Sequence, residues 1–160
     1  LLAVAAVRPL QEAATIRRGE KKGEQSAELR PETKARLELL GRERVLLYRT
    51  LLLTGLRVDE LRTLTVGQLD FTSGQERLQL NAADEKNREG NCLPLRSDLA
   101  ADLRAWVTSQ GRTNANRLFT VPVGLLRILN RDMKAAGIPK RDDRGRTVDV
   151  HAMRTTFGTC

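Results

Sequence analysis

Apolar residues recur at helical spacing over much of this chain, and glycine and proline separate the helical segments from one another. The first apolar run, residues 1–16, is predicted to be the end of a helix, and a polar basic loop follows it. Residues 31–40 and 44–53 are predicted as two helices with a break at Gly41. The second of these helices is strongly apolar, so we expect it at the centre of the core.

Two short strands are predicted after this pair of helices. Gly55 supplies the left-handed cap of the second helix, and a short helix over residues 58–64 follows it. Residues 76–81 alternate polar and apolar side chains as a half-buried strand does, and residues 91–95 are a second candidate strand. Because the charged residues 84–90 lie between them, we expect a small antiparallel hairpin with a charged turn.

Three further helices complete the predicted fold. Ser97 is predicted as the N-cap of a helix over residues 98–109, which carries Trp106 on its inner face. Residues 123–136 form another amphipathic helix, and a last helix is predicted over residues 151–159. The expected fold class is therefore α+β and mostly α-helical, with a small antiparallel sheet or hairpin.

The chain is basic, because its 28 Lys and Arg exceed its 20 Asp and Glu for a formal net charge of +8. Half of this excess lies in residues 127–160, and a basic face favours an anionic partner such as nucleic acid. No apolar run approaches the roughly 20 residues that span a bilayer, so we expect a cytoplasmic protein with no membrane partner. Cys92 and Cys160 lack metal-ligand spacing, and we expect no metal and no cofactor.

Four cationic side chains stand in short motifs that suggest phosphate chemistry. Arg57 lies in Thr-Gly-Leu-Arg-Val-Asp-Glu-Leu, Lys86 in Glu-Lys-Asn-Arg, and His151 and Arg154 in His-Ala-Met-Arg. Each of them alone could be an ordinary surface or structural residue. Arginine, however, offers a planar fork of donors to phosphate oxygens, whereas lysine or histidine can give up a proton. If the four side chains converge, they form a clamp suited to phosphoryl transfer.

The order of these motifs resembles that of the tyrosine recombinases of the phage integrase family. The resemblance implies an integrase-type catalytic domain in which Arg57 and Arg154 clamp the DNA phosphate and Glu60 orients Arg57. It also implies that Lys86 protonates the leaving 5′ oxygen and that His151 handles a proton beside the second arginine. These roles follow from the resemblance, residue by residue.

The match runs from about Arg44 onward, and it departs from the family pattern at several points. The family commonly has leucine and a second histidine where this chain has Met153 and Thr155, and the loss of that histidine predicts weaker activity. The family's nucleophile is a tyrosine downstream of the His-x-x-Arg motif, whereas the only tyrosine here is Tyr48. Tyr48 lies in an apolar helical run, so we expect its ring in the core with its hydroxyl at the rim.

The implied function is site-specific DNA recombination or integration, in which DNA strands are cut and rejoined through a phosphotyrosyl intermediate. The implied partners are double-stranded DNA and other recombinase protomers. We expect residues 1–160 to be one truncated catalytic domain, without the N-terminal DNA-clamping domain and the C-terminal tyrosine segment, and inactive alone. Two alternatives stay open: a non-catalytic DNA-binding remnant or regulator, and an unrelated helical RNA-binding protein.

Overall fold

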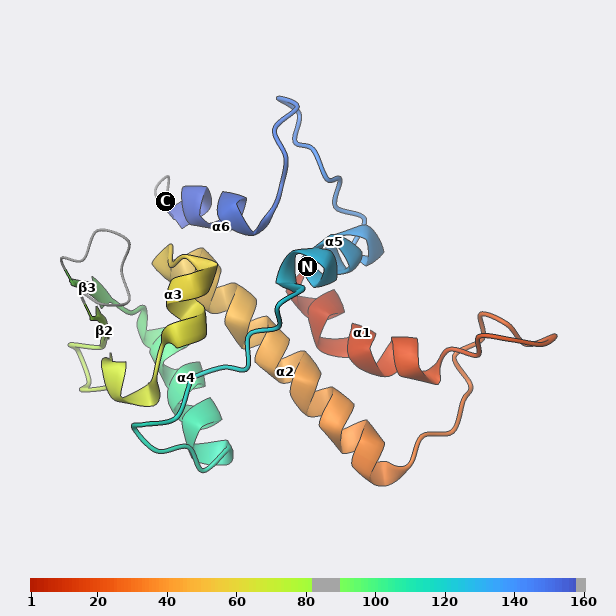
Figure 1. Ribbon diagram of the computed structural model, residues 1–160, viewed down its shortest axis with the longest axis horizontal. Helices are drawn as coiled ribbons and strands as arrows, with labels where there is room; N and C mark the ends of the chain where they lie inside the picture. The colour runs from red at the N-terminus through yellow and green to blue at the C-terminus, as the bar shows by residue number, and fades with distance from the viewer. Residues whose placement is uncertain (82–89, 158–160) are drawn as a thin grey trace.

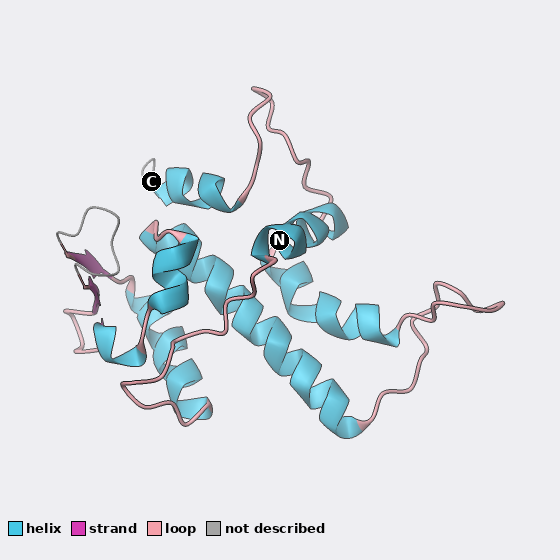
Figure 2. Cartoon of the chain, in the orientation of Figure 1, coloured by secondary structure: helices cyan, strands magenta, loops and turns pink. Residues whose placement is uncertain are grey.

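The structure is a computed structural model that describes residues 1–81 and 90–157. Within these residues the chain is mostly helical, with a small antiparallel sheet at one side (Figures 1 and 2). The predicted α+β, mainly helical fold class is therefore confirmed. The elements in chain order are α1 (Leu2–Ala14), α2 (Pro31–Thr54), α3 (Val58–Thr63), a 3-10 helix (Val66–Gln68), β1 (Leu69–Asp70), β2 (Arg77–Leu80), β3 (Asn91–Pro94), α4 (Ser97–Ser109), α5 (Leu125–Ala135) and α6 (Val150–Phe157).

Helix α2 is the longest element and crosses the middle of the molecule, in contact with α1, α4 and α6 (Figure 1). It runs unbroken through Gly41, so the predicted break at that residue is wrong. Gly41 is buried, and a Cβ built there would lie 1.9 Å from the carbonyl oxygen of Ala6 in α1. The glycine thus permits two helix backbones to touch, which outweighs its cost of about 1 kcal/mol in helix propensity.

The sheet has the strand order β1-β2-β3, and both pairings are antiparallel. The predicted hairpin over residues 76–81 and 91–95 is confirmed, since Leu78 pairs with Leu93 and Leu80 with Asn91. In β2 the leucines are buried and the intervening polar residues are exposed, as the alternation predicts. Strand β1 has only two residues, which is too short to produce a periodic signal, and it was not predicted.

Apart from the break at Gly41, the helix ends that lie within the described residues agree with the predicted ones to within one or two residues, whereas the predicted end at residue 159 lies outside them. Gly55 has φ 65° and caps α2, and its N–H donates to the carbonyl oxygen of Leu51 at 3.1 Å. Helix α4 begins at Ser97 itself, with Arg96 as its N-cap, so the predicted capping role of Ser97 is wrong. Trp106 of α4 is buried as predicted, and its indole N–H donates to the carbonyl oxygen of Leu118 at 3.1 Å.

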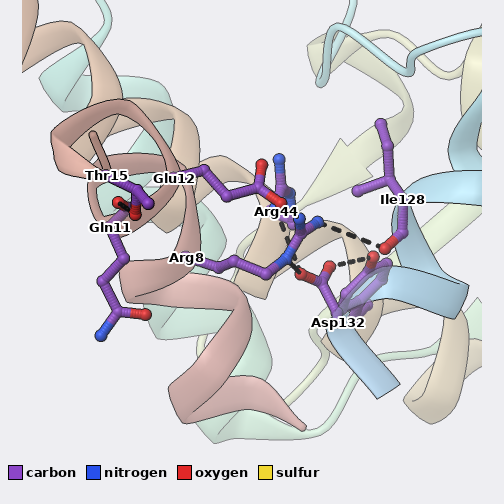
Figure 3. A network of polar contacts seen from close by, with 8 residues as sticks. Arg8, Gln11, Glu12, Thr15, Arg44, Ile128 and Asp132 are labelled. Carbon is purple, nitrogen blue, oxygen red and sulfur yellow. Dashed lines mark hydrogen bonds and ion pairs between the residues drawn. The ribbon is translucent and has the colours of Figure 1, made fainter. Parts of the chain in front are cut away.

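A buried polar network ties α1, α2 and α5 together (Figure 3). Asp132 of α5 is fully buried and accepts hydrogen bonds from Arg8 of α1 and from Tyr48 and Arg44 of α2. Arg8 also bonds the carboxylate of Glu12 and the carbonyl oxygen of Ile128 (Figure 3). These ion pairs fix three helices in one arrangement, because a charge left unpaired in this place would be costly.

None of the helices in the described parts of the chain is long and apolar enough to cross a membrane.

Candidate functional site

A pocket of about 390 Å³ lies where the start of α3, the start of α5 and the first turns of α6 meet. We call it the cationic pocket, since four of its lining residues are basic: Arg57, Arg62, His151 and Arg154. Its remaining wall is mostly apolar and contains one carboxylate; it is formed by Leu56, Val58, Val123, Leu125, Leu126, Asp149 and Val150. The structure thus brings together Arg57, His151 and Arg154, which are up to 97 positions apart in the sequence.

Arg57 is held in place by Glu60. It is the residue that precedes α3, and its backbone N–H donates to Glu60 Oε2 at 2.7 Å. Its guanidinium donates through Nη1 to Glu60 Oε1 at 2.9 Å. The Glu60 side chain is 6% exposed, whereas that of Arg57 is 38% exposed. A buried carboxylate therefore fixes both ends of the arginine while part of the guanidinium remains accessible at the pocket.

Helix α6 carries the other two predicted residues on one side. Its first turn is capped by Asp149, whose Oδ1 accepts the N–H of Ala152 at 2.9 Å. Met153 points into the core, where it is buried among the other apolar residues. Met153 anchors α6 in the core. His151 and Arg154 are three residues apart on this helix, and both line the cationic pocket. Methionine therefore serves as the apolar anchor at the position where the family commonly has leucine.

Arg154 has a buried donor that is unsatisfied within the described residues. Its Nη1 has no hydrogen-bond partner among them, although the atom is excluded from solvent. A buried donor left unpaired costs about 1–3 kcal/mol, so an acceptor is expected to fill this position when a ligand binds. A phosphate oxygen would provide it, since a guanidinium binds phosphate through charge-assisted hydrogen bonds.

Lys86 lies outside the described residues. The described strands that come before and after it in the sequence are β2 and β3. Its role therefore stays a prediction, as does the effect of Thr155 in place of a second histidine.

Tyr48 does not line the cationic pocket. It is fully buried, as predicted, but its hydroxyl is not at the rim: it donates to Asp132 Oδ2 at 2.7 Å in the core. Burial and the hydrogen bond to Asp132 hold the pKa of the Tyr48 phenol far above its ordinary value. A phenol that is both enclosed and hard to ionise is unsuited to attack a phosphate bound at the protein surface.

Sequence reasoning missed Arg62, Val123 and Leu126 as residues of the pocket. Arg62 follows Arg57 by five positions on a short helix, a spacing that does not by itself predict a shared face. Val123 is 97% exposed, an unusual position for a large apolar side chain, and it precedes α5. No sequence pattern indicated that this segment would lie against α6, because the contact joins elements distant in the chain.

Among the described residues, no group of three or more His, Cys, Asp or Glu side chains is placed to hold a metal ion. The chemistry that the cationic pocket offers is anion binding by arginine and proton transfer by histidine.

No family model matches the chain, whereas comparisons with curated proteins and with solved structures each found similar proteins. The chain is 31% identical over 110 residues to a tyrosine recombinase of Pseudothermotoga lettingae, a match that covers 66% of this chain and 35% of that protein. The chain thus spans about a third of the length of this curated relative.

The fold is similar to that of the XerH site-specific recombinase in the crystal structure of its pre-cleavage complex with the difH substrate. The TM-score is 0.54 at 17% sequence identity, and the match covers 99% of this chain and 40% of that chain. At this level of identity the likeness establishes the fold, and the sequence relative supplies the link to a family.

Proposed function

Because this chain belongs to the tyrosine recombinase family, we propose that it supplies the phosphate-binding part of a catalytic domain that cuts and rejoins DNA at specific sites. The substrate is double-stranded DNA, and the whole enzyme acts together with further protomers on that DNA. The proposal assigns this chain the residues that hold and protonate the scissile phosphodiester. It requires an attacking tyrosine from outside residues 1–160, because Tyr48 is enclosed in the core.

The single observation that supports this function best is the meeting of Arg57, His151 and Arg154 in the cationic pocket. Two arginines from separate elements face one concavity, and a buried nitrogen of Arg154 lacks a partner among the described residues. Glu60 orients Arg57 through two hydrogen bonds. An arrangement of this kind is preorganised for a phosphate, since the donors are fixed before the substrate arrives.

In the proposed reaction a tyrosine oxygen attacks the phosphorus, and a bond from tyrosine to the 3′ phosphate replaces the bond to the 5′ oxygen. Arg57 and Arg154 hold the non-bridging oxygens, where negative charge increases in the transition state. His151, beside Arg154, accepts the proton that the attacking tyrosine hydroxyl gives up, and Lys86 donates a proton to the leaving 5′ oxygen. Attack by a 5′ hydroxyl of another strand reverses these steps and rejoins the DNA without a cofactor.

A second candidate is favoured by the burial of Tyr48: residues 1–160 by themselves bind DNA without cutting it. The two candidates share the phosphate contacts and differ only in covalent chemistry. A nicked suicide substrate separates them, because it traps a phosphotyrosyl protein on a denaturing gel.

The DNA-binding part of the proposal is tested with a short fluorescent duplex at about 50 mM and about 200 mM salt. Binding should weaken steeply between the two conditions, and Arg154→Ala should weaken it by about 1.5–3 kcal/mol for every sequence tried. Arg36→Ala is the matched control, because Arg36 is exposed on α2 and lies about 27 Å along that helix from its C-terminal end. Absence of binding, or binding that is insensitive to salt, would refute the proposal.

A further inference from the structure

We propose that Arg62 is a further phosphate-binding residue of the cationic pocket, contacting the DNA backbone beside the scissile phosphate. The inference rests on the proposed function and extends it to a residue with no assigned role. Arg62 lies near the end of α3 and lines the same pocket as Arg57 and Arg154. The pocket therefore has three guanidinium groups, one more than is needed to hold the non-bridging oxygens of a single phosphodiester.

The hydrogen bonds of Arg62 within the described residues do not explain why its side chain lies at the pocket. Its Nη1 pairs with Asp59 three residues earlier on the same helix, and the Asp59 side chain is 89% exposed. A surface pair of this kind contributes about 0–1 kcal/mol. The Nε of Arg62, by contrast, is buried and has no partner among the described residues. The free-energy cost of leaving that donor unpaired exceeds the stabilisation that the surface ion pair contributes.

Arg62 shares this feature with Arg154. Both side chains line the cationic pocket, and each has one buried nitrogen without a partner among the described residues. The nearby carboxylates are already engaged: Glu60 bonds Arg57, Asp59 pairs with Arg62, and Asp149 caps α6. An anion with several oxygens offers acceptors to the unpaired nitrogens of both Arg62 and Arg154. The DNA backbone offers such anions at regular spacing.

The side chain of Arg62 is 40% exposed, so its remaining donors can reach a ligand at the pocket mouth. In the proposed function Arg57 and Arg154 bind the scissile phosphate. Arg62 would therefore bind the neighbouring phosphate of the DNA backbone. This assignment predicts an effect on binding and on salt dependence, because the contact is to a backbone phosphate and not to a base.

The experiment measures the dissociation constant of the 160-residue chain for a fluorescent duplex over a series of salt concentrations. Arg62→Ala should reduce the slope of log K against log salt by about 1, the change expected when one phosphate contact is lost. Arg62→Lys should keep most of the slope because it keeps the charge. Arg36→Ala controls for the loss of one positive charge far from the pocket.

Asp59→Asn distinguishes ligand binding from a structural role of the ion pair. If Arg62 binds phosphate, removing the competing carboxylate leaves the affinity equal to or higher than that of the unchanged chain. If Arg62 serves only to pair with Asp59, then Asp59→Asn and Arg62→Ala should have the same effect. Thermal denaturation of each variant establishes that it is folded.

The possible failures can be told apart. If the unchanged chain does not bind the duplex, the proposed function itself fails, and the role of Arg62 fails with it. If the chain binds and Arg154→Ala weakens binding, but Arg62→Ala matches Arg36→Ala in slope and affinity, only the role of Arg62 is overturned. Equal weakening by Asp59→Asn and Arg62→Ala overturns it as well.

Discussion

Replacing Asp132 with alanine should destabilise this protein more than any change on its surface. The carboxylate is fully buried and accepts hydrogen bonds from Arg8, Arg44 and Tyr48, which come from two other helices (Figure 3). Without it, two arginines that are largely buried lose their shared counter-charge. Breaking a buried ion pair from one side costs about 3–5 kcal/mol. For a chain of this size that loss lowers the melting temperature by about 6–20 °C.

The assay is urea denaturation followed by circular dichroism and by the fluorescence of Trp106, the only tryptophan. Asp102→Ala is the control: Asp102 pairs with Arg49 at the surface, and its loss should cost less than about 1 kcal/mol. If Asp132→Ala leaves too little folded protein to measure, Tyr48→Phe removes one donor and should cost about 1 kcal/mol. An Asp132→Ala variant that unfolds within 1 kcal/mol of the unchanged chain would refute the reasoning, as would a Tyr48→Phe variant as stable as the unchanged chain.

Three further predictions concern other parts of the molecule. Burial and the hydrogen bond to Asp132 raise the pKa of Tyr48 above 10.0, so its phenolate absorbance should appear only as the protein unfolds. Above pH 10 the unfolded chain loses a proton that the native chain keeps. The free energy of unfolding should therefore fall by about 1.4 kcal/mol per pH unit relative to that of Tyr48→Phe. Phenolate absorbance in the native protein at pH 10 would contradict this. Gly41→Ala should destabilise the chain by about 1–3 kcal/mol in urea denaturation, because the new Cβ meets the Ala6 backbone; a stabilised variant would mean that helix propensity outweighs the contact. On a nicked suicide substrate, residues 1–160 should form no covalent adduct with DNA, and a labelled band at protein mass on a denaturing gel would contradict the exclusion of Tyr48 as nucleophile.

Local patterns predicted most of the helices and the β2–β3 hairpin. The signals at Gly55, in the alternation of β2 and in the apolar face around Trp106 depend on neighbours within a few residues, and the structure agrees with them. The break predicted at Gly41 is wrong for a reason that no local rule contains. There the contact that decides the conformation comes from α1, some 35 positions away.

The candidate site divides in the same way. The motifs around Arg57 and around His151 and Arg154 were recognisable by residue type and order, and the cationic pocket contains all three. Arg62 and Val123 belong to the same pocket but carry no local signal. They join it only because the fold brings segments of α3, α5 and α6 together around one pocket, with α6 packed on α2.

By itself, the sequence determined which residues could bind a phosphate and which segments would form helices, because both depend on side-chain chemistry and short-range spacing. The tertiary structure alone decided which of those side chains meet, that Gly41 lies at a helix crossing, and that the Tyr48 hydroxyl faces Asp132 and not solvent. The physical reason is that burial and ion pairing join residues far apart in the chain. Asp132 and Arg8, for example, are 124 positions apart, and they can form an ion pair only after the helices have packed.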